Sequence, residues 1–417
     1  MNKQKNPVNP VYPVQKEGPV PPPSSAPVVA QPISRSAVYF AGFVALGLAM
    51  AIIGPTLPIL AENTGSQISQ IGILFTVRSL GGLIGAPLTG RLYDRRPGHK
   101  ILALVLLAMA LMLALLPLGN HLWQLALVVF FLGIVEIGLD IGGNTLLMWL
   151  HGERVSPYMN ALHFFFGVGA FFAPIILAQM LLLNEGPAGV RWTYWLIALL
   201  MLPVAAWVWR TASPESPEKA NGNQNARPVP RLILFFLIAL FFLYVGAEVS
   251  FGGWIYSYAL QQGLATAVSA AYLTSLFWGA LMVGRLISVP LARWVPPRGM
   301  LAGALVGCLF SSALLLSRPD SMPVLYAGTA AMGLFMAVIF PTLLSFAERR
   351  MTISGRVTSW FFIGATLGAM SLPWLAGQVL DRVSPLAFLG LVAAILVAEM
   401  VVFLLLVLIS WTRPEKR

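Results

Sequence analysis

The stretch GRLYDRRPGHK, residues 90–100, places five charged side chains between two long apolar runs, 68–90 and 101–119. A helix of about 20 mostly apolar residues is long enough to cross the hydrocarbon core of a bilayer. The rest of the chain repeats this alternation, because 58% of its 417 residues are hydrophobic and only 10% are charged. That composition is too apolar for a soluble globular protein, so the sequence predicts an all-α integral membrane protein.

Twelve apolar runs of sufficient length follow one another along the chain. The expected spans are 36–61, 68–90, 101–119, 122–149, 158–183, 190–210, 232–260, 267–292, 299–317, 323–347, 356–380 and 385–411. The longest break, 211–231, has linker composition and divides the spans six and six. The predicted organisation is therefore a disordered, Pro-rich tail at 1–35, a six-helix half at 36–210, the linker at 211–231, a second six-helix half at 232–411 and a short tail at 412–417.

Orientation follows from the basic residues, since loops on the cytoplasmic side of a membrane protein carry an excess of Lys and Arg. With the N-terminus inside, all but five of the 26 Lys and Arg residues lie on the cytoplasmic side. We therefore predict that both termini are cytoplasmic and expect the plasma (inner) membrane as the location. This distribution also explains the net charge of +11 without a nucleic-acid partner.

The sequence carries none of the short motifs of the common hydrolases. A phosphate loop, an HExxH pair and a GxSxG turn are all missing from the chain, so neither ATP hydrolysis nor proteolysis has support. The single cysteine, Cys308, lies within an apolar run and cannot form a cysteine metal site alone. We expect no enzymatic activity, no cofactor and no bound metal.

Ionisable side chains within the spans are costly unless they face protein, water or a partner, so each is a candidate for function. They are Arg78, Glu136, Asp140, His163, Glu248, Arg285 and Glu399. Glu136, Asp140 and Asn144 are spaced four apart and form one polar stripe on a helix. Depth counted along the helices predicts a structural Arg78–Glu136 pair. Asp140 is then the candidate for a coupling carboxylate, an acid whose binding of a proton or sodium ion would change which way a membrane cavity opens, and Glu136 is the second candidate for this role. The alternative is a structural pair between Arg78 and Asp140.

A second intramembrane pair is predicted between Arg285 and Glu399 in the C-terminal half. The alternative places Glu399 at a crevice or facing lipid in its protonated form.

Candidate substrate-binding residues gather on several expected helices. Asn160 and His163 share one helical face, and Glu248 lies on one face with Tyr258, close to Trp254. An acid beside aromatic rings suits a sugar, because carboxylates accept hydroxyl hydrogen bonds and rings cover apolar CH patches. The full set of substrate candidates is Asn144, Asn160, His163, Glu248, Trp254, Tyr258, Trp278 and Trp360. The competing interpretation of the lone His and of the aromatic side chains is ordinary packing.

The loop at 90–100 resembles the signature loop of the major facilitator superfamily, roughly GxLxDRxGRK. Gly90, Leu92, Asp94 and Arg95 match in place, while Pro97 makes the loop one residue longer before Gly98. The resemblance implies that this loop, with Gly90 and Gly98, acts as a conformational latch between two halves, and it carries that role to Asp94 and Arg95. A small residue at position 90 is also expected to let two helix ends approach closely. The competing interpretation is a solvated turn.

Four further stretches resemble the fucose/proton symporter branch of that superfamily and the related sodium-dependent glucose transporters of animals. They are TVRSLGG at 76–82, LDIGGNTLL at 139–147, NALHFFFGVGAFFAP at 160–174 and YVGAEVSFGGWIYSYA at 244–259. Asp140 matches an acid of the family pattern, and His163 occupies a position that is polar and faces the cavity in the family. The first span, 36–61, lacks the acid that the fucose symporter pattern carries there.

This resemblance implies a twelve-helix major facilitator fold whose halves rock to give alternating access. It also implies a monomer that imports a monosaccharide or similar polar solute with protons, or alternatively with sodium. An efflux antiporter for drugs or lipophilic cations is the first rival, which the buried acids would also serve. A non-transporting receptor or scaffold is the second.

Overall fold

The computed structural model describes residues 31–93, 95–214, 231–351 and 355–411, and the described chain is helical apart from short connections. The helices are α1 (Gln31–Thr64), α2 (Ile68–Ile71), α3 (Ile73–Tyr93), α4 (Gly98–Leu115), α5 (Leu122–His151), α6 (Ser156–Leu183), α7 (Pro187–Arg210), α8 (Arg231–Gln261), α9 (Ala267–Leu291), α10 (Pro297–Ser317), α11 (Met322–Glu348), α12 (Gly355–Arg382) and α13 (Pro385–Trp411), with two 3-10 turns, η1 (Leu116–Leu118) and η2 (Gly152–Arg154). The latch candidate Asp94, residues 1–30, most of the predicted linker and the C-terminal tail lie outside the described residues.

Twelve helical segments of the described chain are long and apolar enough to span a membrane, with α2 and α3 together forming the second span. The prediction of twelve spans is therefore confirmed. The first helix begins earlier than expected, at Gln31 instead of residue 36. A 2.7 Å hydrogen bond joins Ser36 Oγ, at the first residue of the expected span, to His151 Nε2 of α5.

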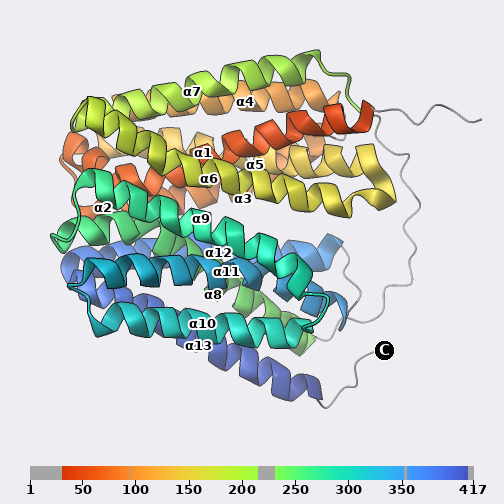
Figure 1. Cartoon of the computed structure of the whole chain (residues 1–417). Helices are drawn as coiled ribbons and strands as arrows, with labels where there is room; N and C mark the ends of the chain where they lie inside the picture. Colours follow the sequence, from red (N-terminus) through yellow and green to blue (C-terminus); the bar gives the residue numbers. More distant parts are fainter. Residues whose placement is uncertain (1–30, 94, 215–230, 352–354, 412–417) are drawn as a thin grey trace, which may run out of the picture.

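The helices form two groups, α1–α7 and α8–α13, which lie beside each other in the upper and lower parts of Figure 1. Within the first group α3 packs on α5, α1 on α6 and α4 on α7; within the second, α8 packs on α12 and α11 on both α9 and α10. The groups meet along α6 and α9, along α3 and α12, and along α1 and α8. We call the end of the bundle where α1 begins and α7 ends the linker end, and the opposite end the far end.

Glycines set the closest helix contacts, because small residues let backbones approach where lipid gives no hydrophobic drive for association. A Cβ on Gly169 of α6 would collide with the Val44 carbonyl of α1, and a Cβ on Gly47 with the Phe166 carbonyl of α6. At Gly54 a Cβ would lie 2.6 Å from the carbonyl oxygen of Gly253, so α1 and α8 touch there through their main chains.

The close helix approach expected at Gly90 of the latch loop is found at a different glycine. Gly90 lies in the last turn of α3 with open space around its Cα, so it permits no close helix approach. The close approach is made instead at Gly98, where a Cβ would overlap the side chain of Leu146 on α5. The inserted Pro97 is the residue that precedes α4, which lets Gly98 open that helix against α5.

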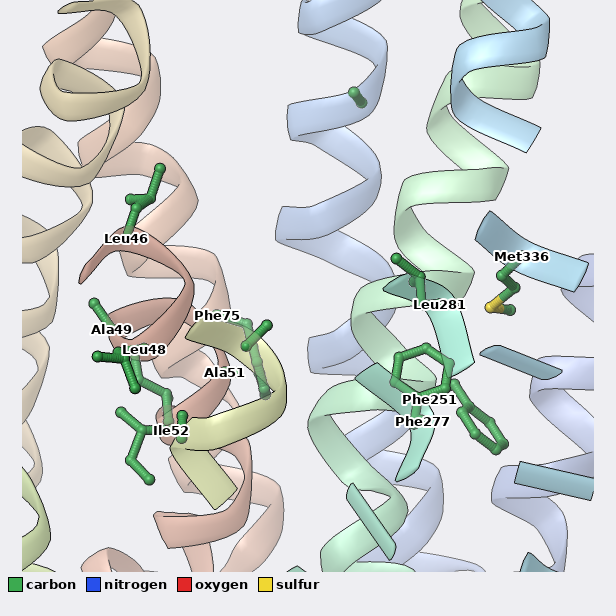
Figure 2. Packing of buried hydrophobic residues seen from close by; sticks show 14 of the residues in the cluster. Leu46, Leu48, Ala49, Ala51, Ile52, Phe75, Phe251, Phe277, Leu281 and Met336 are labelled. Carbon is green, nitrogen blue, oxygen red and sulfur yellow. The ribbon is translucent and has the colours of Figure 1, made fainter. Parts of the chain in front are cut away.

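Buried apolar side chains form one cluster that runs through both groups (Figure 2). Leu46 and Ile52 belong to its part in the first group, and Phe251 and Phe277 meet in the second with ring centroids 5.3 Å apart. Phe75 of α3 links the two parts, because its ring lies 5.7 Å from that of Trp254 on α8.

Gly169→Ala should destabilise the protein by about 1–3 kcal/mol, since the added methyl group collides with a backbone carbonyl that cannot turn away. Gly303→Ala on α10 is the matched control, because a Cβ there meets nothing within 4 Å and Ala is a better helix former than Gly. Thermal unfolding of the purified variants in detergent checks this. Equal melting temperatures for the two variants would contradict the packing argument.

Candidate functional site

The ion pair between Arg78 of α3 and Glu136 of α5 is bidentate. Arg78 Nε donates to Glu136 Oε2 at 2.6 Å and Nη2 donates to Oε1 at 2.8 Å. The two side chains are only 11% and 7% exposed, so each charge depends on the other. The predicted pair is present, and the alternative pairing of Arg78 with Asp140 is excluded because the guanidinium is engaged by Glu136.

Asp140 lies one turn further along α5 and has no cationic partner among the described residues. Its carboxylate oxygen Oδ1 accepts a 3.0 Å hydrogen bond from Asn144 Nδ2, which also donates to the Asp140 carbonyl. Asn144 therefore acts as the partner of Asp140 in this conformation. An acid that holds only an amide can still take up a proton or a small cation.

The seam of contact between α6 and α9 is closely packed near the far end and more exposed near the linker end. Near the far end Gln179 Nε2 donates to the Tyr272 hydroxyl at 2.7 Å, and Ser275 Oγ donates to the Phe171 carbonyl at 2.8 Å. At mid-length a Cβ on Gly167 would lie 3.0 Å from Met282.

One and two turns closer to the linker end, His163 and Asn160 on the same face of α6 are exposed. The seam therefore opens towards the linker end, with these two candidates on its wall. His163 also packs edge-on against Phe43 of α1, with ring centroids 5.9 Å apart.

The C-terminal group contributes a charged cluster to the same region. Arg285 of α9 lies within electrostatic range of Glu248 of α8 and, across the seam, of His163 of α6, without forming an ion pair with Glu248 in the described structure. Tyr244 lies one turn before Glu248 and beside its carboxylate. The structure thus brings together three residues that were predicted separately, Arg285, Glu248 and His163.

The predicted pair between Arg285 and Glu399 is wrong. Glu399 is fully buried, and both of its carboxylate oxygens lack a hydrogen-bond partner within the described ranges. The physical reason is the packing order, because α13 packs against α8, α10 and α12, whereas Arg285 on α9 faces α8 and α6.

Trp278 of α9 shares a helical face with Met282 and Arg285. Its indole Nε1 is buried and has no hydrogen-bond partner in the described part of the chain. A buried donor of this kind costs free energy unless a ligand or a water accepts from it. Trp360, in contrast, is 45% exposed near the linker end of α12.

Trp254 and Tyr258 lie outside the cluster, towards the far end of α8, and both are fully buried. Trp254 Nε1 donates to the Pro373 carbonyl of α12 at 2.7 Å, and its ring lies 5.7 Å from that of Phe75. Tyr258 donates to the Pro319 carbonyl at 3.4 Å. In this conformation both side chains pack between helices and reach no solute.

Hydrogen bonds across the two groups close the far end. The Ser69 backbone N–H donates to Asp381 Oδ2 at 3.0 Å, Gln378 Nε2 donates to the Ser69 carbonyl at 2.6 Å, and Thr76 Oγ1 donates to the Met370 carbonyl at 2.7 Å. Sequence reasoning missed these residues, because Asp381 and Gln378 lie at a span end, where polar side chains are ordinary. The spacing of three residues between Gln378 and Asp381, which puts them on one helix face, was the only sequence feature that could have indicated this contact.

The same helices part towards the linker end. On α3 the face that carries Thr76 continues to Leu80 and Leu83, which are 41% and 40% exposed. Together with the exposure of Asn160 and His163, this shows that the groups diverge beyond mid-length.

Metal binding finds no support in the described residues, since no group of three or more His, Cys, Asp or Glu side chains there could hold an ion.

Comparisons with known proteins agree with this architecture. The model of the Major Facilitator Superfamily matches residues 39–373. Sodium-dependent glucose transporter 1 of Danio rerio is 31% identical over 379 residues, which is 82% of this chain and 64% of that protein.

Two solved structures share the fold. A mutant of the nucleoside transporter NupG superposes with a TM-score of 0.72 at 12% identity, over 89% of this chain and 99% of that one. A mutant of the E. coli fucose:proton symporter, FucP, gives 0.60 at 19% identity, over 90% and 99%.

Glu136→Gln should destabilise the protein by about 3–5 kcal/mol, because it leaves the Arg78 guanidinium buried without a counter-charge. The double variant Arg78→Met/Glu136→Met should recover most of that loss, since it removes both charges together. The melting temperatures of the two variants, beside the wild type, provide the measurement. A double variant less stable than Glu136→Gln would show that the pair contributes by a different mechanism.

Proposed function

Since the chain belongs to the major facilitator superfamily, we propose that it is a secondary transporter that moves a monosaccharide or a similar polar solute together with protons, or alternatively sodium. The observation that carries the proposal is the charged cluster of His163, Glu248 and Arg285, which lies where the two helix groups meet. Transporters of this architecture bind their solute near mid-depth, between two repeats that rock about it.

Alternating access requires that the bundle close at one end while it opens at the other. The Ser69–Asp381 and Gln378–Ser69 hydrogen bonds close the far end, and the exposed Asn160 and His163 line the opening towards the linker end. The bias of Lys and Arg supports a cytoplasmic linker end, with both termini on that side. This conformation is accordingly the inward-facing one. We take the plasma (inner) membrane as the location and the monomer as the working unit.

The chemistry of the cluster suits a hydroxyl-rich solute. Glu248 accepts hydrogen bonds, whereas Arg285, His163 and the free Nε1–H of Trp278 donate them, and a sugar offers both partners on every hydroxyl group. A lipophilic cation would be repelled by the Arg285 guanidinium, which weighs against the drug-efflux alternative. A receptor or scaffold gives no reason for charged groups at mid-depth between two mobile halves.

Coupling is assigned to Asp140. Arg78 neutralises Glu136, so Asp140 is the acid of the N-terminal group that remains free of a cation among the described residues. Uptake of a proton or a cation there would change the charge beside α1 and α6, and thereby the balance between the two conformations. The apolar part of α1, residues 36–61, contains no acid that could share this role, and Glu62 is exposed in the last turn of the helix.

Asp140→Asn should abolish gradient-driven accumulation while it preserves exchange of labelled for unlabelled solute, because the solute site remains intact. Uptake of a hexose and deoxyhexose panel into proteoliposomes, with an imposed proton or sodium gradient, measures both. Asp320→Asn at the exposed far end is the matched control and should behave as the wild type. Accumulation retained by Asp140→Asn would refute the coupling role, and movement of no sugar under any gradient would refute the solute class.

Trp278→Phe should raise the KM for the transported solute by about tenfold, since loss of one hydrogen bond in a buried site costs roughly 1–1.5 kcal/mol. Trp294→Phe is the control, because Trp294 is 79% exposed in the turn after α9. Initial uptake rates over a range of solute concentrations provide the comparison. A KM unchanged by Trp278→Phe would remove this indole from the binding site.

A further inference from the structure

The packing face of α13 contains one acid. Phe388, Val392, Leu396 and Phe403 are buried at helical spacing, and Glu399 occupies the same face with no exposed surface. Glu399 lies 14 residues from the first residue of α13 and 12 from the last, hence near mid-depth of the bilayer. An apolar side chain of similar volume would fill this position at lower cost, so packing does not account for the carboxyl group.

The surroundings of Glu399 contain no basic group among the described residues. Helix α13 packs against α8, α10 and α12, and α10 and α13 lie side by side at the lower edge of Figure 1. The titratable groups within electrostatic range of Glu399 are Tyr244 of α8 and Cys308 of α10, and within the described residues α12 contributes none. An ionised carboxylate there would be uncompensated in a medium without water, which costs several kcal/mol.

Tyr244 connects this acid to the solute site. Its hydroxyl interacts with Glu248 one turn along α8 and also with Glu399 on α13, and it is buried without a hydrogen-bond partner in the described structure. The hydroxyl therefore lies within electrostatic range of both acids and makes a direct hydrogen bond with neither of them in this conformation. Buried polar groups left unpaired in this way are ordinarily bridged by an internal water or by a small rotation of the side chains.

We propose that Glu399 is a second proton-binding site, which exchanges its proton with Glu248 through the hydroxyl of Tyr244. In the transfer the Glu399 O–H bond breaks and its proton passes to the Tyr244 oxygen, while the original Tyr244 proton forms a new O–H bond on the Glu248 carboxylate. One proton moves, the tyrosine is regenerated, and neither an electron nor a co-reactant is needed.

The position of Arg285 supplies the link to the solute. While Arg285 faces Glu248, it stabilises the ionised form of that acid, and the proton rests on Glu399. A solute that engages Arg285, or a rocking motion that withdraws it, moves the proton to Glu248. This inference rests on the proposed transport function, since it adds a proton site in the C-terminal group to the one assigned to Asp140.

The first test needs no solute. Infrared difference spectra of the purified protein over a range of pH report the carbonyl band of protonated carboxyl groups. Glu399→Gln should remove one such band, whereas Glu185→Gln, at an exposed loop position, should leave it in place. Tyr244→Phe should keep the band but slow its exchange in heavy water. Identical spectra for the wild type and Glu399→Gln would overturn the proposal, whether or not the protein moves sugars.

The second test uses proteoliposomes. Glu399→Gln and Tyr244→Phe should reduce accumulation driven by a proton gradient to the level without a gradient, while both keep solute exchange. Full accumulation by Glu399→Gln would refute the relay. If Glu399→Gln does not fold, Tyr244→Phe carries the same test, because phenylalanine preserves the packing and removes only the hydroxyl. A wild-type protein that moves no solute would refute the transport function alone, and the spectra would still decide the proton site.

Discussion

Every polar group between the two ends of this bundle has to find its partner inside the protein, because lipid tails offer none. The helices meet this constraint for the main chain, and the bidentate Arg78–Glu136 pair meets it for two charges of the N-terminal group. Some side-chain groups remain unpaired within the described residues, among them Trp278 Nε1 and the Glu399 carboxyl. The proposed solute site and the proposed second proton site are built on these two groups.

The hydrogen bonds that join the two helix groups and the charged residues between those groups lie at different depths of the bundle. The far end is held by hydrogen bonds to main-chain atoms of Ser69, one from its N–H to the Asp381 carboxylate and one to its carbonyl from Gln378. Arg285, Glu248 and His163 lie beyond that closure, towards the linker end. The contacts that close the far end are therefore separate from the charged residues nearer the linker end.

The twelve spans could be predicted because bilayer thickness requires long apolar runs, and the Arg78–Glu136 pair because equal depth on neighbouring helices brings charges together. Sequence alone could not assign Arg285 to Glu248 in place of Glu399, since depth does not reveal which helices are neighbours. Trp254 was expected at the solute site for a similar reason: helical spacing gives a face but not the helix that covers it. The role of Gly98 in place of Gly90 depended on where α3 ends, and span boundaries are the least certain part of such predictions.

The contact between Gly54 and Gly253 joins the two groups through bare main chain. A main-chain contact of this kind has no side-chain rotamers of its own to change, so it adds no rotamer-entropy cost when the two groups tilt. The contact sets the distance between the two groups at this point but not the angle between them. The rate of rocking would then depend on the hydrogen bonds at the far end and on the solute, and not on side-chain rearrangement at the Gly54–Gly253 contact.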